Sequence, residues 1–515
     1  MRAALEKLPL SVILMLVSSL LMLVPASHAL VAGEYAVSRS FFYSGLELSF
    51  LAGFLAIARS GRTAGDDPRR TLLALSASFV ALPLALALPF HEAVGNTTWI
   101  NAYVEMVSSL TTTGASMFED PARLPASVHL WRALVGWFGG LIMWVAAVAV
   151  LAPLAMGGFE VRADAGEDAR AGITAGNAIG SGRAQDIRSA SLSQRLAAFS
   201  MKLAPLYAGL TLVLWVGLIV AGDTPFVAAN HAMSTLATSG ISPVGGLSGG
   251  SAGTAGEVMI AVFLVFAVSR LAFDRQGQRG TLHRLLVDPE MRLGAAIVVG
   301  VTAVLFLRHW IGAYGVAAEA NLLAGLRALW GMAFTVLSFL TTTGFESAAW
   351  AGARDWSALD TQGLVLMALA LIGGGVATTA GGAKLLRVYA MYKHSSRELQ
   401  KLLLPSSIAG AGREARHIRS RGAFRAWIFF MLTALAVALY MLAFALTGLD
   451  FPTALVLTTA ALTTTGPLAA WVTPDPVIYE TLANGPKLIL ASAMIVGRLE
   501  ILAIVVLVSP EIWRR

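Results

Sequence analysis

The sequence has no cysteine and little charge. None of its 515 residues is Cys, and only 13% are Asp, Glu, Lys or Arg, whereas about 25% are charged in an ordinary soluble domain. The absence of cysteine excludes disulfide bonds, thiolate catalysis and thiolate metal ligands. The eight histidines have no metal-ligand spacing, and no pattern of His, Ser and Asp in the sequence indicates a catalytic group. We therefore predict a protein that is not an enzyme and uses no cofactor.

Hydrophobic residues make up 57% of the chain, above the roughly 45–50% of soluble domains. Apolar runs of about 18 residues or more are long enough to cross the hydrocarbon core of a membrane. We predict ten such spans, at 9–31, 41–59, 72–90, 130–153, 202–221, 256–273, 293–310, 363–391, 426–448 and 486–509.

Lys and Arg are concentrated in loops that alternate with poorly charged ones. Six segments hold 29 of the 37: 1–8, 58–72, 157–202, 270–292, 384–425 and 510–515. Because such loops stay in the cytoplasm, both termini are predicted to be cytoplasmic. The net charge of +7 then belongs to loops beside anionic lipid, and a nucleic-acid surface is the less economical interpretation.

The first apolar run has a basic start and a small-residue Ser-His-Ala near its end, as secretory signals do. Its length favours a retained span. The Ala/Gly-rich stretch 163–185 is predicted to be a flexible linker.

A string of hydroxyl residues followed by glycine occurs four times. The copies are "SSLTTTGAS" (108–116), "STLATSGIS" (234–242), "SFLTTTGFES" (338–347) and "TAALTTTGP" (459–467). Each ends an apolar stretch of about 10 to 14 residues, too short to span, and lies between two predicted spans. The repeating unit is therefore a span, a short re-entrant helix, a glycine loop and a second span.

Four such units predict an all-α polytopic membrane protein with parallel repeats and fourfold pseudosymmetry, preceded by two extra spans. The predicted division is an N-terminal pair of spans, pore repeat 1, a cytoplasmic linker, pore repeats 2 and 3, a cytoplasmic basic segment and pore repeat 4. Their bounds are 1–60, 61–160, 161–195, 196–275, 276–392, 393–425 and 426–515.

Irregular backbone at membrane depth is tolerated where it is buried in protein or lines water. Four loops around one axis can offer backbone carbonyls and hydroxyls that replace the hydration shell of a monovalent cation. One such string alone would be explained by small-residue helix contacts. For four copies we predict a potassium-binding filter of Thr112, Thr113, Gly114, Thr238, Ser239, Gly240, Thr342, Thr343, Gly344, Thr464, Thr465 and Gly466.

Three further stretches accompany these loops: "LVGWFGGLIMW" in repeat 1, "LIGGGVATTAGGAKLLRVY" in repeat 3 and "MIVGRLEILAIVVLVSPEIWR" in repeat 4. With the four glycine loops, they resemble the Trk/Ktr/HKT superfamily of potassium transporters, and most of all its TrkH branch, over almost the whole chain. Repeat 2 departs from the pattern, because its loop reads Ala-Thr-Ser-Gly and its following span lacks a glycine pair.

The resemblance implies potassium uptake across the bacterial inner membrane, with K⁺ as substrate. It also implies a homodimer and a TrkA-type cytoplasmic regulatory subunit that binds nucleotides. Glycine at position 114 favours K⁺, since serine there is associated with sodium permeation in the family. A sodium-permeable or ion-coupled symporter of the same superfamily is the alternative. Arg416, Arg419 and Arg421, in the basic segment, are candidates for docking the regulatory subunit.

The resemblance also implies a gate beneath the filter, formed by Gly374, Gly375, Gly381, Gly382 and Arg498. Passive packing of small residues is the alternative for the glycines. For Arg498 it is structural pairing, with Glu500 as a possible partner. Glu105, Asn230 and Asp450 are expected either to concentrate cations at the outer mouth or to serve as caps and surface groups.

Overall fold

Within the described part of the chain, every regular element is a helix, as the all-α prediction requires. The computed structural model describes residues 9–59, 68–152, 158–159, 192–269, 286–313, 322–351, 362–403, 420–473 and 476–501. The stretch 163–185, predicted to be a linker, lies outside these residues.

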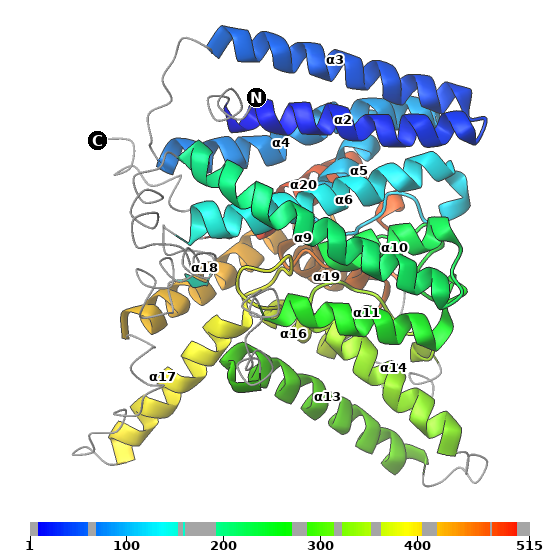
Figure 1. Cartoon of the computed structure of the whole chain (residues 1–515). Coiled ribbons are helices and arrows are strands. Elements are labelled where there is room, and N and C mark those ends of the chain that lie inside the picture. Colours follow the sequence, from blue (N-terminus) through cyan, green and yellow to red (C-terminus); the bar gives the residue numbers. More distant parts are fainter. Residues whose placement is uncertain are drawn as a thin grey trace, which may run out of the picture.

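The first two helices, α2 (Leu10–Val31) and α3 (Tyr35–Arg59), pack against each other at one edge of the molecule (Figure 1). Inside this pair, Ser38 Oγ donates to the carbonyl of Ala26 at 2.8 Å. Toward the rest of the protein, Ser127 Oγ donates to Glu34 Oε2 at 2.7 Å. The pair is therefore attached to the flank of repeat 1.

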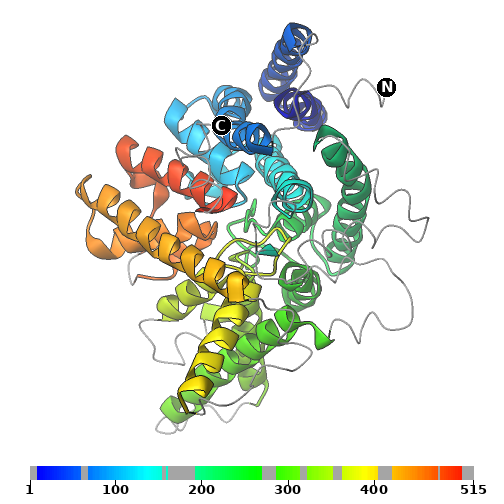
Figure 2. The ribbon, with the colours of Figure 1, turned by 90° about the vertical axis from the view of Figure 1, so that its left-hand side faces the viewer.

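The remaining helices form four consecutive repeats. Their bounds are α4 (Pro68–Val94), α5 (Trp99–Leu110) and α6 (Ala126–Ala146); α9 (Leu192–Val220), α10 (Pro225–Ala237) and α11 (Gly253–Val268); α13 (Pro289–Ala313), α14 (Leu322–Leu340), α16 (Gln362–Ile372) and α17 (Leu385–Leu403); and α18 (Ser420–Ala445), α19 (Phe451–Leu462) and α20 (Asn484–Leu499). In the view along many of these helices, the four repeats surround the loop that follows α16 (Figure 2).

Seven helices in the described residues are long and apolar enough to cross a membrane. The predicted span 256–273 corresponds to α11, which has 16 residues. The predicted span 363–391 is not one helix, because residues 373–384 form an irregular loop between α16 and α17. The predicted span 486–509 begins as α20, and its end lies beyond the described residues.

The short helices α5, α10, α14 and α19 precede the four glycine loops. Three of them begin with a side-chain cap, in which Thr98, Thr224 and Asp450 accept a backbone N–H of the first turn. The third short helix, α14, is longer than predicted, at 19 residues. It extends backward through Leu322, because the preceding Leu and Ala residues favour helix and no proline interrupts them.

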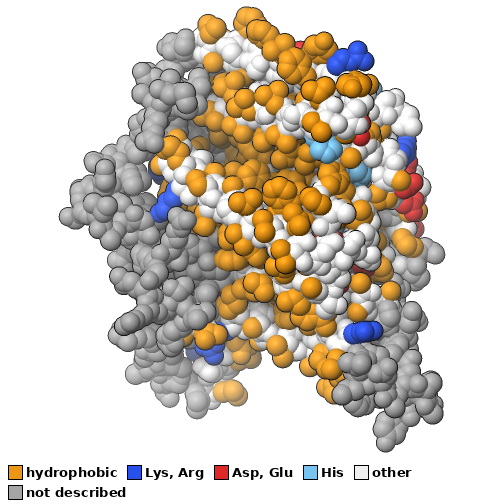
Figure 3. Space-filling model, turned by 45° about the vertical axis from the view of Figure 1, so that its right-hand side comes forward, with side chains coloured by type: hydrophobic (Ala, Val, Ile, Leu, Met, Phe, Trp, Pro, Cys, Tyr) orange, Lys and Arg blue, Asp and Glu red, His pale blue; other side chains and the backbone are white. Residues whose placement is uncertain are grey.

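The outer surface is apolar over its middle. Figure 3 shows one face on which hydrophobic side chains cover the centre and charged side chains lie toward the edges. Large apolar side chains are exposed on several spans, including Val213, Val262, Val299 and Leu439. A soluble protein rarely exposes so continuous an apolar surface, so this belt fits lipid.

Candidate functional site

The four short helices end in the same turn. In each, the middle hydroxyl residue has a left-handed backbone, with φ of 55° at Thr112, 52° at Thr238, 57° at Thr342 and 53° at Thr464. The N–H of the next residue donates to the carbonyl five residues earlier, at 2.8–2.9 Å, which is the Schellman ending of a helix. That position usually holds glycine, and a β-branched residue there is strained. Fourfold recurrence of this strain points to a functional constraint on the hydroxyls.

The first and third threonines fix the turn from inside. The Thr111 hydroxyl donates to the Val107 carbonyl at 2.8 Å and contacts the Thr113 hydroxyl at 2.8 Å. Thr341 with Thr343 and Thr463 with Thr465 repeat the arrangement at 3.1 and 3.2 Å. In repeat 2 the first threonine is replaced by Ala237. There Ser239 contacts Ser234 instead, at 3.0 Å, so the third hydroxyl is still held.

The four glycines bring the loops into a closed ring. A methyl group on Gly114 would overlap the Ser239 carbonyl oxygen, and one on Gly240 would overlap that of Thr343. On Gly344 it would lie 2.8 Å from Pro467 Cγ, and on Gly466 it would lie 2.6 Å from the Gly114 carbonyl carbon. The loop of each repeat therefore contacts the loop of the next repeat, and the loop of repeat 4 contacts that of repeat 1.

Two hydroxyls at the inner end of these loops have no partner. Among the described residues, Thr112 Oγ1 and Thr464 Oγ1 are buried without a hydrogen bond. Buried hydroxyls are nearly always bonded, so an unpartnered pair in adjacent repeats suits contact with an ion or its water. Thr342 differs, because its Oγ1 accepts the N–H of Gly381 at 2.6 Å.

The loop 373–384 lies directly beneath this ring. Thr379 Oγ1 donates to the Leu236 carbonyl at 3.0 Å, which connects the loop to the end of α10. Gly381 is bonded to Thr342, and a methyl group on it would overlap the Thr463 carbonyl. The loop therefore contacts the ends of three of the four short helices.

The other predicted gate glycines allow close approaches within the same region. Gly382 has φ of 75° and touches Gly373. A methyl group on Gly374 would lie 2.6 Å from the Ala267 carbonyl oxygen, and one on Gly375 would overlap the Val268 carbonyl. The end of α11, which has no glycine pair of its own, thus packs against glycines of repeat 3.

Arg498 is 4% exposed and reaches the same loop from α20. Its Nη1 donates to the Thr379 carbonyl at 2.6 Å. The alternative partner Glu500 is instead paired with Arg387, at 2.7 Å. Glu500 follows the last residue of α20 and has φ of 65°, so it is not part of the helix that carries Arg498. Lys384 donates to the Ala380 carbonyl, and Lys384, Arg498 and Met143 all line a cavity of about 30 Å³.

Comparison with known proteins agrees with this geometry. The TrkH family model, described as a cation transport protein, matches residues 276–515. The Trk system potassium uptake protein TrkH of Salmonella typhimurium is 28% identical over 431 residues, covering 83% of this chain and 82% of that protein. TrkH of Halomonas elongata is 29% identical over 420 residues, covering 81% and 80%. The crystal structure of the potassium transporter TrkH from Vibrio parahaemolyticus matches 99% of both chains with a TM-score of 0.79 and 25% identity.

The chain is similar to the TrkH cation-transport proteins. Its polytopic α-helical fold is that of the solved TrkH structure, and the relatives are named as transporters rather than enzymes.

A set of hydrogen bonds behind the loops was not predicted from sequence. The residue nine positions before the glycine holds the chain that follows it in three repeats. Glu105 accepts the N–H of Met117 at 2.6 Å, His231 bonds Ser242 Oγ at 2.9 Å, and Thr335 accepts the N–H of Ser347 at 3.3 Å. The equivalent position in repeat 4 is Leu457, so that loop needs other support.

Glu105 is buried and paired with Arg132 of α6, at 2.6 Å between Oε1 and Nε. It does not line an outer mouth. Asn230 is also buried and donates to the Phe226 carbonyl at 2.8 Å, while Asp450 caps α19. The expectation of a cap is therefore confirmed for Asp450, whereas Glu105 and Asn230 are buried and are neither caps nor surface groups.

Glu257 links repeat 2 to repeat 3. It lies on α11 and is 4% exposed, and its carboxylate accepts the Ser347 hydroxyl at 2.8 Å and the Ala348 N–H at 2.7 Å. Repeat 2 thus holds the segment that follows Gly344 in repeat 3. No local pattern in sequence shows such a contact, since the groups are about ninety residues apart.

Proposed function

We propose that the protein takes up K⁺ across the bacterial cytoplasmic membrane through the ring of four loops. The observation that carries the proposal is the closed sequence of contacts among Gly114, Gly240, Gly344 and Gly466. The printed names of the TrkH relatives, which are potassium uptake proteins, support the choice of ion. A sodium-permeable or ion-coupled protein remains the alternative.

The chemistry is replacement of water by fixed oxygens. Backbone carbonyls and the inner threonine hydroxyls would surround a dehydrated cation, as in potassium filters. The negative C-terminal ends of α5, α10, α14 and α19 point at the same region. Nothing in this arrangement requires a cofactor, and K⁺ is the substrate.

The loop beneath the ring would act as the gate. Its contacts with Leu236, Thr342 and Thr463 support a position across the path below the filter. Arg498 adds a fixed positive charge there, and two unit charges 4 Å apart interact by about 4 kcal/mol at an effective dielectric constant of 20. Opening would require the Arg498–Thr379 bond to break and the glycines Gly374, Gly375, Gly381 and Gly382 to change conformation.

The homodimer and the regulatory subunit rest on the family resemblance, whereas the topology rests on the distribution of Lys and Arg and on the four repeats. We propose a homodimer with both termini cytoplasmic, the domain division given above, and regulation by a TrkA-type subunit. Arg416 and Arg419 and the side chain of Arg421 lie outside the described residues. The described helix α17 carries exposed polar residues up to Leu403, and its amphipathic end suits a cytoplasmic surface.

Growth of a bacterium without its own potassium uptake systems tests the proposal. The chain is expressed with and without a TrkA-type subunit at limiting K⁺. We expect growth to be restored, and more fully with the subunit. Failure at limiting K⁺ by protein that reaches the membrane, together with uptake of Na⁺ alone, would favour the sodium-permeable alternative.

A further inference from the structure

The fourth filter loop is built differently from the other three. Gly114, Gly240 and Gly344 have positive φ, whereas Gly466 begins the short 3-10 helix η6 (Gly466–Ala470). Its N–H donates to the Thr113 carbonyl at 2.6 Å. The fourth loop therefore turns toward repeat 1 through its backbone.

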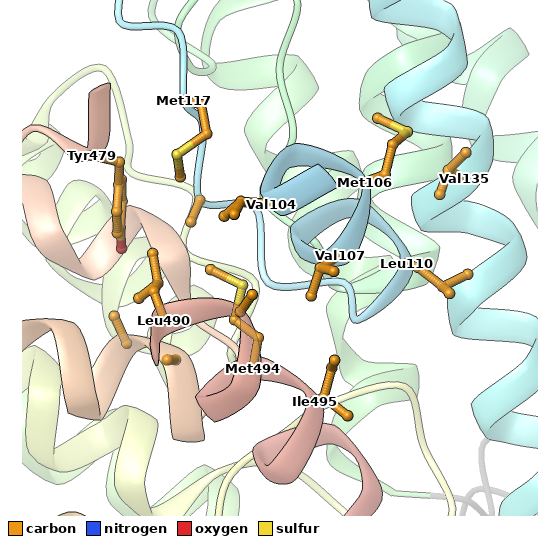
Figure 4. Packing of buried hydrophobic residues seen from close by; sticks show 14 of the residues in the cluster. Val104, Met106, Val107, Leu110, Met117, Val135, Tyr479, Leu490, Met494 and Ile495 are labelled. Atoms are coloured by element: carbon orange, nitrogen blue, oxygen red, sulfur yellow. The ribbon is translucent and has the colours of Figure 1, made fainter. Parts of the chain in front are cut away.

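The carbonyl of Gly466 is held from outside the loop. Tyr479, 8% exposed, begins the short helix η7 (Tyr479–Thr481) and donates its hydroxyl to this carbonyl at 2.8 Å. The Tyr479 ring belongs to the buried cluster that includes Met117 and Leu490 (Figure 4). A carbonyl has two acceptor sites, so this bond leaves one of them for an ion.

Neighbouring contacts fix the position of Tyr479. Glu480 forms an ion pair with Arg123 and accepts the N–H of Glu119 at 3.2 Å, both in the outer segment of repeat 1. Lys487 Nζ donates to the Glu480 carbonyl at 2.9 Å. The hydroxyl is therefore anchored to repeats 1 and 4 at once, which replaces the polar support that Leu457 cannot give.

The residue after Gly466 reaches two other loops. A methyl group on Gly240 would lie 2.9 Å from Pro467 Cγ, and one on Gly344 would lie 2.8 Å from it. Repeat 2 stands opposite repeat 4 in the ring. A shift of Gly466 would consequently move Pro467 against two loops and change the size of the opening that the four loops enclose.

From these contacts we propose that Tyr479 is a positioning residue for ion selectivity, acting through the Gly466 carbonyl and Pro467. The inference rests on the proposed function of the ring as a potassium filter. Selectivity in carbonyl filters depends on cavity size or on the field of the carbonyls, and the Tyr479 hydroxyl acts on both. Its loss would leave the protein folded, because the ring of Tyr479 would still pack.

The test is Tyr479→Phe in the full chain, purified and reconstituted in liposomes, with K⁺ and Na⁺ fluxes measured separately. We expect the K⁺/Na⁺ flux ratio to fall about two- to tenfold, the range to which one ordinary hydrogen bond corresponds. Glu480→Gln should change the ratio in the same direction by a smaller factor. The matched control is Tyr440→Phe, which removes only a 3.4 Å contact with Ser492 and should leave the ratio unchanged.

The outcomes separate the two claims. If Gly114→Ser changes the flux ratio but Tyr479→Phe does not, the inference is wrong and the proposed filter stands. If the unmodified protein carries no K⁺, both are wrong. A ratio that falls equally in Tyr479→Phe and Tyr440→Phe would also overturn the inference, since the effect would then not depend on Gly466.

Discussion

Arg498 donates a hydrogen bond to the backbone carbonyl of Thr379 at 2.6 Å, and so joins the last described helix to the broken span of repeat 3. The two residues are 119 positions apart. Two further nitrogens of the same guanidinium, Nε and Nη2, are buried and have no hydrogen-bond partner among the residues that the structure describes. The Arg498 guanidinium is bonded to one carbonyl and has further N–H donors. It can therefore release that carbonyl and bind others as the loop moves.

Removal of this cation should open the pathway. We expect Arg498→Ala to raise basal K⁺ flux by about tenfold. A barrier lowered by about 1.4 kcal/mol gives that factor, and the repulsion between K⁺ and the guanidinium is larger than this. Flux into liposomes without a regulatory subunit measures it. The control is Arg425→Ala, at an exposed arginine, which should not alter flux. A folded Arg498→Ala protein with parental flux would make Arg498 a packing residue.

Stiffening the loop should affect gating and not ion choice. Gly381→Val places a branched side chain against the Thr463 carbonyl and the Thr464 hydroxyl. We expect the loop to move and relieve this overlap while the filter carbonyls keep their positions. Flux should then change several-fold while the K⁺/Na⁺ ratio stays within about twofold of the parent. Gly209→Val, at a glycine with open space around it, is the control. A changed ratio with unchanged flux would assign Gly381 to the filter.

Bulk in the ring should impair discrimination. Gly114→Ser introduces a Cβ that overlaps the Ser239 carbonyl oxygen, at a glycine with φ of 74°. The ratio of K⁺ to Na⁺ flux should fall about tenfold, the factor that 1.4 kcal/mol of lost preference gives. Gly344→Ser should act similarly. Gly300→Ser, in open space on α13, should have no effect, and equal behaviour of Gly114→Ser and Gly300→Ser would contradict the filter.

The sequence was informative where one short string determines local structure. Each TTTG-like string ends a short helix, as predicted, because the turn is built from bonds within six residues. The gate glycines that the resemblance implies lie in an irregular loop, in a stretch predicted to be one span. The strain was not predictable, since β-branched Thr112 and its equivalents are expected to avoid the left-handed region.

Contacts between distant residues were the part that sequence could not give. The Glu105–Arg132 pair and the bridge from Glu257 to repeat 3 depend on how spans pack. The hydrogen bond from Tyr479 to Gly466 joins residues 13 positions apart, and the sequence between them has no periodic pattern that predicts it. In repeat 2, Ala237 lacks the hydroxyl that the first threonine has in the other repeats. The structure shows that Ser234 contacts Ser239 in its place.

The buried ion pair behind the first loop should be important for stability. Arg132→Met leaves Glu105 as an uncompensated buried charge and should lower the free energy of unfolding by about 3–5 kcal/mol. Thermal unfolding of the purified protein in detergent measures the loss. The double variant Glu105→Leu, Arg132→Met should recover part of it. Additive losses in the double variant would mean that the two side chains do not interact.

The outer turn between α9 and α10 should be sensitive to acid. Interaction with the His231 ring, and then two N–H bonds from Ser251 and Ala252, hold the pKa of Asp223 below its ordinary value of 3.8. A carboxyl with a lowered pKa in the folded state stabilises the fold above 3.8 and loses that contribution as pH falls through the folded value. Asp223→Asn should therefore be less stable than the parent at pH 7. Melting curves from pH 7 to pH 3 should show the gap closing, and a gap that widens in acid would contradict the assignment.

The central claim is that four loops of one chain form a potassium pathway. Its most direct test is K⁺ flux into liposomes that contain only the purified full-length protein, driven by a membrane potential, with Na⁺ flux measured under the same gradient. The account predicts K⁺ entry that exceeds Na⁺ entry and that Gly114→Ser reduces this preference. Absence of K⁺ entry by folded protein, or equal entry of both ions that Gly114→Ser leaves unchanged, would contradict it.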